Sequence, residues 1–337
     1  MSKSLLVTGG AGFIASHFIH YIKQKYPDYH IINIDKLTYA GSETNLKHIT
    51  YSENYDFIEG DIADEQLIND IFSTYDIEGV IHFAAESHVD RSIKDVKAFI
   101  QSNVLGTAVL LQAARDAWNK AGELHTRRFH QVSTDEVYGS LELDGGGKFN
   151  EQTPYDPRNP YSASKSGADM LVKSFGHTYG MNVVTSSSSN NYGPGQHAEK
   201  LIPTIISNAL QGNSIPIYGD GKNVRDWLYV TDHCHALDMI FHHGNALEKY
   251  NVGGGNEKTN IELAMTICDI LDHLRPGHDS YKELITFIGD RKGHDRRYAV
   301  DDSKIKTTLG WKPFTTFETG IHKTVEWYVE QWEKIAP

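Results

Sequence analysis

The feature that most constrains this chain is an alternation of short apolar runs with helix-length segments through its first half. Parallel strands need helix-length crossovers, so the alternation predicts an α/β fold, a doubly wound parallel sheet with helices on both faces. Segments 13–26 and 96–118 carry apolar residues at helical spacing and are predicted helices. The strand-like runs are 5–7, 31–34, 55–58, 79–83, 129–132 and 183–186.

The second half of the chain has a different rhythm. From about residue 191, glycine-rich turns such as 253–255 interrupt short strands and helices, which predicts a second, smaller, mixed α/β domain. Segment 228–243 is expected to return to the first domain. The predicted domains are residues 1–191 joined by 224–251, and residues 192–223 with 252–337.

Charge and composition narrow the classes of partner. The 337 residues carry a formal charge of -12, whose field repels phosphate polyanions, so no nucleic-acid partner is expected. Only Cys234 and Cys268 are present, far apart in sequence, which favours a reducing compartment over a disulfide framework. The apolar run 5–7 is too short for a signal sequence, and no stretch approaches a membrane span. We predict a cytoplasmic protein without a membrane partner.

A glycine turn follows the first predicted strand and opens the first predicted helix. Gly9 and Gly12 permit a tight turn where backbone can approach a pyrophosphate, at a helix N-terminus that favours anions. Ala15 stands where a third glycine often sits and is small enough for close packing. Asp35 ends the second strand and can accept hydrogen bonds from a ribose, which favours NAD over NADP. Asp61 is a candidate for the adenine edge. The alternatives are that Asp35 caps a turn and Asp61 caps a helix.

Tyr161 and Lys165 stand four residues apart, a spacing that places both on one face of a helix. An ammonium near a phenol favours the phenolate and lowers its pKa toward neutrality. Such a pair can take a proton from a sugar hydroxyl while hydride leaves for NAD. Because the spacing also occurs by chance, this interpretation depends on the accompanying dinucleotide site.

Two acids follow the predicted strand 129–132 directly, at the sheet edge where ligands bind. Thr134 can hydrogen-bond the reacting hydroxyl. Of Asp135 and Glu136, one carboxylate can abstract a proton next to a ketone while the other acid protonates a departing hydroxyl, which indicates an elimination. The alternative is that the two acids begin a solvated turn.

These motifs resemble the dTDP-glucose 4,6-dehydratases, a family of the extended short-chain dehydrogenases, over nearly the whole chain. The resemblance implies a Rossmann fold, and its most discriminating motif is the Thr-Asp-Glu triplet. The matching segments are TGGAGFI (8–14), DKLTYAG (35–41), AAESHVDRS (84–92), STDEVYG (133–139), YSASK (161–165), SNNYGP (189–194), EKLIP (199–203), RDWLYV (225–230) and GHDRRY (293–298).

The resemblance implies roles for five residues in removing water from dTDP-glucose. Tyr161 would be the base for oxidation at C4, with Lys165 binding the nicotinamide ribose and lowering the pKa of Tyr161, and Thr134 assisting at the C4 oxygen. Glu136 would remove the C5 proton. Asp135 would donate a proton to the leaving C6 hydroxyl, and the hydride would return to C6.

The resemblance also implies two binding sets, and no metal is expected in either. Arg225 suits a diphosphate because a guanidinium can bind phosphate oxygens as a fork, the alternative being a surface ion pair with Asp226. The NAD set is Gly9, Gly12, Phe13, Ile14, Asp35, Lys36, Leu37, Thr38, Asp61, Ile62, Phe83, Ala84, Ala85, Ser87, Ser102, Tyr161, Lys165 and Asn191. The nucleotide-sugar set is Ser87, Thr134, Asn190, Lys200, Leu201, Pro216, Ile217, Tyr218, Arg225, Asn260, Asp290, Arg291 and His294.

Other interpretations stay open at this point. Segment 195–198 departs from the family pattern beside the expected substrate pocket, so a UDP-linked or N-acetylated hexose is an alternative substrate. A UDP-sugar 4-epimerase would share the glycine turn, Tyr161 and Lys165 but would not need the two acids. A redox-sensing binding protein would keep the dinucleotide fold without the chemistry, and the presence of Tyr161 and Lys165 argues against it. The resemblance further implies a homodimer, formed by a four-helix bundle of segments 96–118 and 161–179.

Overall fold

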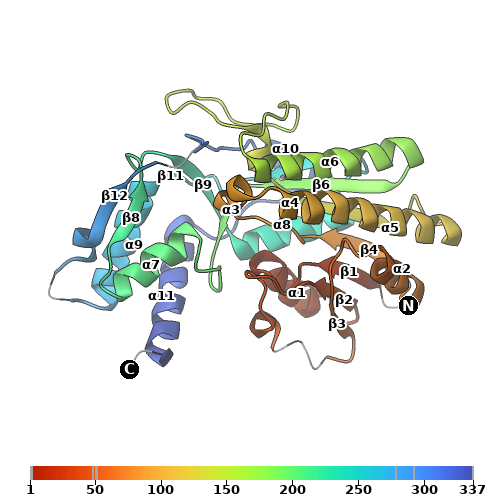
Figure 1. Ribbon diagram of the computed structural model, residues 1–337, viewed down its shortest axis with the longest axis horizontal. Coiled ribbons are helices and arrows are strands. Elements are labelled where there is room, and N and C mark those ends of the chain that lie inside the picture. Colours follow the sequence, from red (N-terminus) through yellow and green to blue (C-terminus); the bar gives the residue numbers. More distant parts are fainter. Residues whose placement is uncertain (1–2, 48, 50–51, 278, 291–292, 336–337) are drawn as a thin grey trace.

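The computed structural model describes residues 3–47, 49, 52–277, 279–290 and 293–335, and its central element is a seven-stranded parallel sheet (Figure 1). The strand order β3-β2-β1-β4-β5-β6 with β10 outside β6 is that of a doubly wound dinucleotide-binding sheet, which confirms the predicted fold class. All six predicted strands are present. The strands are β1 (Ser4–Thr8), β2 (His30–Asp35), β3 (Tyr55–Glu59), β4 (Ile77–His82), β5 (Arg128–Thr134), β6 (Asn182–Ser188) and β10 (Lys249–Val252).

Helices cover both faces of this sheet, as expected for strands that are apolar on both sides. One face packs on α1 (Phe13–Lys25) and α8 (Val230–His243). The other packs on α2 (Glu65–Thr74), α5 (Thr107–Ala121) and α6 (Pro160–Tyr179). The chain reverses its winding direction between β1 and β4, so the loops leaving these two strands diverge at the sheet edge and open a crevice there.

The predicted helix 96–118 is helical but not uniform. After α3 (Val89–Lys94), α4 (Lys97–Phe99) runs into the π-helix η2 (Ile100–Gly106), which continues as α5. A π-helix has a wider turn than an α-helix, and such turns occur often at functional sites. Here the turn presents Gln101 to the cleft described below.

The second half of the chain forms smaller sheets. One holds β11 (Glu257–Thr259), β9 (Val224–Tyr229) and β7 (Asn190–Tyr192), and the other pairs β8 (Ile215–Tyr218) with β12 (Ile285–Ile288). They share an apolar core with α7 (Leu201–Leu210), α9 (Asn260–Leu274) and α11 (Phe317–Ile335), while α10 (Ser303–Leu309) packs on β10 and α8. Short 3-10 helices are η1 (Glu43–Leu46), η3 (Asp135–Tyr138) and η4 (Tyr281–Leu284). The predicted domain boundaries stay a prediction. Every described helix is too short or too polar to traverse a bilayer.

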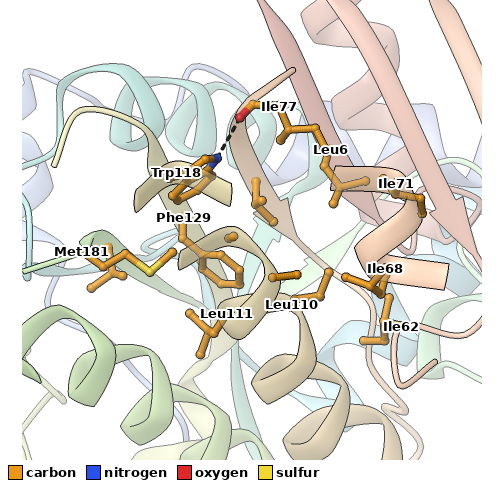
Figure 2. Close-up of a cluster of buried hydrophobic side chains, with 14 of the residues drawn as sticks. Leu6, Ile62, Ile68, Ile71, Ile77, Leu110, Leu111, Trp118, Phe129 and Met181 are labelled. Atoms are coloured by element: carbon orange, nitrogen blue, oxygen red, sulfur yellow. Dashed lines mark hydrogen bonds between the residues drawn. The ribbon is translucent and has the colours of Figure 1, made fainter. Parts of the chain in front are cut away.

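One core cluster fastens α2 and α5 to the sheet (Figure 2). Trp118 of α5 is fully buried there, and its indole Nε1 donates a hydrogen bond to the Ile77 carbonyl at 2.8 Å (Figure 2). The indole therefore supplies both apolar area and a partner for a backbone group at the start of β4.

Replacing Trp118 by alanine should lower the free energy of unfolding by about 3–5 kcal/mol, because a large cavity opens under α5. Trp118→Phe keeps most of the volume and should lose less. Urea unfolding followed by circular dichroism measures both. Phe314→Ala is the control, since Phe314 is 64% exposed and its replacement should change stability by no more than about 0.5 kcal/mol. Equal losses at the two positions would contradict this account of the core.

Candidate active site

A cleft of about 380 Å³ lies at the carboxyl ends of the parallel strands. It gathers all the predicted catalytic residues, and among the described residues Leu37 is the one predicted NAD residue outside its lining. Residues from both binding sets line it: Gly9, Gly12, Phe13, Ile14, Asp35, Lys36, Thr38, Asp61, Ile62, Phe83, Ala84, Ala85, Ser87, Ser102, Thr134, Asp135, Glu136, Tyr161, Lys165, Asn190, Asn191 and Lys200.

The glycine turn forms a backbone cradle on one wall of the cleft. Gly9 has φ +71°, and a Cβ on it would lie 2.7 Å from the Ala84 Cα, so only glycine fits there. Gly12 is the N-cap of α1 and supplies no side-chain cap. The N–H groups of the first turn therefore face the cleft mouth for an external acceptor, and the positive end of the helix dipole favours an anion there.

Two carboxylates lie near this turn. Asp35 accepts hydrogen bonds from the backbone N–H groups of Ala11 at 2.9 Å and Leu37 at 2.8 Å, and burial raises its pKa. Asp35 therefore caps the turn, as the alternative interpretation expected, and it also lines the cleft. Its binding of a ribose stays a prediction. Asp61 accepts from Lys36 at 2.6 Å. The alternative that Asp61 caps a helix is wrong, because Asp64 is the N-cap of α2.

Tyr161 and Lys165 lie side by side on α6, facing the end of β5. Both are buried, and the Lys165 Nζ donates to the Val132 carbonyl at 2.8 Å. Burial raises the pKa of Tyr161, the charge of Glu136 raises it further, and a hydrogen bond with Thr134 opposes them. Burial disfavours the charged form of Lys165 as well, and for an ammonium this lowers the pKa. The pKa of Tyr161 is therefore raised, and the lowering that the sequence predicts from Lys165 is not seen.

Asp135 is a buried carboxyl at the start of η3. Its side chain is 2% exposed, and Oδ2 has no hydrogen-bond partner within the part of the chain that the structure describes. Burial raises the pKa of Asp135 well above its usual value, and the negative charge of Glu136 adds to this. Asp135 therefore keeps its proton where an exposed aspartate is ionised. The alternative of a solvated turn is wrong for this residue.

Glu136 sits in a different setting. Its Oε2 accepts hydrogen bonds from the Ser162 hydroxyl at 3.2 Å and from the Asn159 amide at 3.4 Å. Asn159 also caps α6, since its Oδ1 accepts from the Ser162 backbone N–H. The cap of α6 therefore orients Glu136 toward the cleft, beside Tyr161.

Sequence reasoning missed a buried chain of hydrogen bonds behind this wall. Asp169 accepts from the Ser133 hydroxyl at 2.6 Å and from the Tyr155 hydroxyl at 2.8 Å, and Lys249 donates to Tyr155 at 2.7 Å. The charge of Asp169 also opposes the fall in the pKa of Lys165. A signal was present, because Asp169 follows Lys165 by four residues on the same helix face.

The predicted nucleotide-sugar residues divide between two places. Ser87, Thr134, Asn190 and Lys200 line the cleft, while Arg291 lies outside the described residues. The others lie outside the cleft lining, in the second half of the fold: Leu201, Pro216, Ile217, Tyr218, Arg225, Asn260, Asp290 and His294.

Arg225 is buried, unlike a surface residue, and belongs to the predicted nucleotide-sugar residues outside the cleft lining. It is 6% exposed, its guanidinium donates to the Asp295 carbonyl at 3.0 Å, and it lies 4.3 Å from the centre of the Tyr298 ring. It is therefore no surface residue. Nearby, His294 lies 2.6 Å from Asp290 and contacts the Tyr218 ring. These residues form a polar wall of the second sheet region, separate from the cofactor side of the cleft.

Comparison with known proteins agrees with this geometry. A family model described as GDP-mannose 4,6 dehydratase matches residues 6–324. The dTDP-glucose 4,6-dehydratase of Salmonella typhimurium is 50% identical over 339 residues, covering 97% of this chain and 94% of the relative. This chain belongs to the dTDP-glucose 4,6-dehydratase family. The resemblance of the motifs is thus confirmed.

Solved structures agree with the family assignment. The dTDP-glucose 4,6-dehydratase from Streptomyces venezuelae, with NAD and TYD bound, is 42% identical with a TM-score of 0.90 and covers 99% of both chains. The UDP-glucose 4-epimerase of Thermotoga maritima, with UDP-glucose, is 28% identical with a TM-score of 0.85, covering 98% of this chain and 99% of that one. Dehydratases and epimerases therefore share this fold, and side chains must distinguish them.

Replacing Asp135 by asparagine should stabilise the dehydratase-family fold at neutral pH. The folded carboxyl keeps a proton that the unfolded chain releases above about pH 4. The stability that Asp135 contributes is full below that pH and is lost as pH rises toward its raised folded pKa. The gain in the free energy of unfolding of Asp135→Asn should therefore grow between about pH 4 and about pH 7, as urea unfolding can measure.

Asp301→Asn is the control of opposite sign. A hydrogen bond from Ser303 lowers the pKa of Asp301, so its stabilising effect is present above the unfolded pKa and lost as pH falls. This variant should lose more stability at neutral than at acid pH. A gain for Asp135→Asn that does not change with pH would contradict a buried, protonated Asp135.

Proposed function

We propose that this chain is an NAD-dependent dTDP-glucose 4,6-dehydratase, which converts dTDP-glucose to dTDP-4-keto-6-deoxyglucose and water. The observation that carries the proposal is the pair of acids, Asp135 and Glu136, in one cleft with Tyr161 and Lys165. Oxidation and reduction of a sugar need only the tyrosine and lysine. Loss of water needs in addition one group that removes a carbon-bound proton and one that protonates the leaving hydroxyl.

The cleft fits NAD. The backbone cradle at Gly9 has no room for a Cβ, α1 begins without a side-chain cap, and Asp35 offers a carboxylate beside them. These residues would hold the pyrophosphate and the adenosine ribose, and Tyr161 and Lys165 would lie at the nicotinamide end. When bound, NAD supplies a hydride acceptor at C4 of the sugar and a hydride donor at C6.

The chain's own residues move the protons. Tyr161 takes the proton of the C4 hydroxyl, and the Thr134 hydroxyl hydrogen-bonds the same oxygen. The C4 ketone makes the C5 proton acidic, so Glu136, held by the cap of α6, removes it. Asp135, whose raised pKa keeps it protonated, gives its proton to the departing C6 hydroxyl. An elimination requires one acid that gives a proton and one that takes a proton, and buried Asp135 and hydrogen-bonded Glu136 are proposed to fill these two roles.

The nucleoside diphosphate is proposed to lie on the wall formed by the second half of the chain. Lys200 borders the cleft and Arg225 lies deeper, behind the Tyr298 ring. Asp290 and His294 are proposed to complete this site with Asn260. Segment 195–198 departs from the family pattern, and its residues Gln196 and His197 line the cleft. A UDP-linked hexose is therefore the alternative substrate, and a panel of dTDP- and UDP-hexoses separates the two.

A UDP-sugar 4-epimerase is the second candidate function, supported by the fold likeness to the Thermotoga maritima enzyme. The buried Asp135 counts against it, since epimerisation leaves C5 and C6 untouched. Incubation with dTDP-glucose distinguishes the two, because a 4-keto product absorbs in alkali and a galactose epimer does not. Absence of the keto product would refute the proposed dehydratase.

Glu136→Gln and Tyr161→Phe should block different steps. Glu136→Gln leaves the oxidation intact, so the absorbance of reduced nicotinamide should rise with substrate while keto product falls about 10²–10⁴-fold. Tyr161→Phe removes the base for oxidation, so even that absorbance should be absent. Stopped-flow absorbance with quenched product assays tests both. Normal product formation by Glu136→Gln would remove this residue from the mechanism.

We propose further that the protein is a cytoplasmic homodimer. Both cysteines are unpaired and buried, which suits a reducing compartment. Large exposed apolar side chains occur on α3, on η2, on α6 and just before α4, and both α3 and η2 pack against α6. Such a patch is typical of a protein interface. Its members are Ile93, Val96, Ile100, Leu105, Met170 and Tyr179, each 42–59% exposed.

Met170→Glu should dissociate this dimer, because it places a charge at the most exposed apolar side chain of the patch. Light scattering across a dilution series measures the change from dimer to monomer. Met265→Glu is the matched control, since Met265 is an exposed methionine on α9, away from the patch. A monomeric mass for the unmodified protein would refute the dimer.

A further inference from the structure

The proposed reaction does not return the site to its starting protonation state. C4 leaves as a ketone, so the proton taken from its hydroxyl stays on Tyr161. The proton that Asp135 gives to the C6 hydroxyl leaves in the water molecule. Glu136 takes the C5 proton and gives a proton back to C5 when the hydride returns to C6, so Glu136 ends in its starting protonation state. After each turnover Tyr161 therefore holds one proton more, and Asp135 one fewer, than before it.

The Thr134 hydroxyl lies between these two groups. It hydrogen-bonds the Tyr161 side chain on one side, and its Oγ1 donates to Asp135 Oδ1 at 3.4 Å on the other. The direction of the second bond matches a proton moving toward Asp135. Thr134 is held in place as the N-cap of η3, where its oxygen also accepts the Glu136 backbone N–H at 3.3 Å. Catalytic hydrogen bonds of this length commonly shorten when substrate binds.

We propose that Thr134 is a proton relay that resets the site, carrying a proton from Tyr161 to Asp135 after each turnover. The proposal rests on the dehydratase function proposed above. In the step, the Tyr161 O–H bond breaks as a Thr134 O–H bond forms, and the original Thr134 O–H bond breaks as an Asp135 O–H bond forms. No electron pair leaves the site. One negative charge moves from Asp135 to Tyr161.

Burial explains why a relay is needed. Asp135 is 2% exposed, and its other oxygen, Oδ2, has no partner among the described residues, so the Thr134 hydroxyl is its direct link to a proton source. The charge of Asp135 raises the pKa of Tyr161, which disfavours the state with both groups ionised. Tyr161 and Asp135 thus share one proton, and its return conserves the charge of the buried site.

Thr134→Val tests the relay because it keeps the shape of the side chain and removes the hydroxyl. NAD-loaded protein is mixed with excess dTDP-glucose and quenched over the first and later turnovers. We expect a burst of about one keto product per site, followed by a steady rate roughly 10²-fold below the first-turnover rate. Thr134→Ser restores a hydroxyl and should abolish the burst. Thr134→Ala repeats the test if valine impairs folding.

A spectroscopic signal separates the relay from a structural role. During the slow phase of Thr134→Val, the ultraviolet band of the Tyr161 phenolate should be lost and recover only with each slow turnover. Tyr161→Phe identifies the band. If Thr134→Val slows the first turnover as much as the later ones, or shows no burst, the relay is overturned. If the unmodified protein makes no keto product, the proposed function fails instead.

Discussion

Two hydrogen bonds between α6 and the end of β5 hold the whole candidate site together. Lys165 of α6 donates to the Val132 carbonyl, and Ser133 of β5 donates to Asp169 of α6. These bonds set the helix against the strand end at a fixed height. As a result Tyr161, which precedes Lys165 by one turn, faces Thr134 and the two acids that follow. A shift of α6 along the sheet would separate Tyr161 from Asp135 and Glu136.

Packing α6 against the end of β5 costs desolvation free energy, because it buries titratable side chains that water would otherwise solvate. Burial raises the pKa of Asp135 and Tyr161 and lowers that of Lys165, all in directions that favour the neutral forms. The buried charge of Asp169 opposes the effect on Lys165. A low-dielectric site strengthens each remaining charge interaction, so the position of one proton changes the state of its neighbours. The same burial that destabilises the site makes its protons interdependent.

Features of the fold that depend on the local pattern of apolar and glycine residues were predicted from the sequence. Six strands, the glycine turn and the cleft position of Tyr161 with the acids followed from periodicity and from where parallel strands end. The π-helix η2 was missed because seven residues of π-helix and of α-helix carry nearly the same apolar spacing. Support of Glu136 by Asn159 and Ser162 was missed as well, since it joins segments more than twenty residues apart through tertiary packing.

The pKa of Tyr161 and the position of Arg225 depend on tertiary structure that the motifs do not specify. Tyr161 and Lys165 were correctly paired on one face, yet the expected pKa effect depends on burial, which spacing alone does not give. Arg225 was expected from the family resemblance, with its chemistry in support, but its place against the Tyr298 ring comes from the pairing of β9 with β7 and β11. Residues of the second half reach their positions only after the chain has crossed between sheets. No local pattern carries that information.

Fold alone does not decide the chemistry of this family, because an epimerase at 28% identity overlays with a TM-score of 0.85. What the epimerase reaction does not require is a proton donor kept neutral at the sugar's C6. In this chain the proposed donor, Asp135, lies on η3, a single 3-10 turn whose N-cap is Thr134. The turn buries Asp135 while leaving Glu136 hydrogen-bonded at the cleft, so one short element gives adjacent carboxyls opposite environments. That contrast in burial and hydrogen bonding suits the proposed elimination, in which one acid donates a proton and the other accepts one.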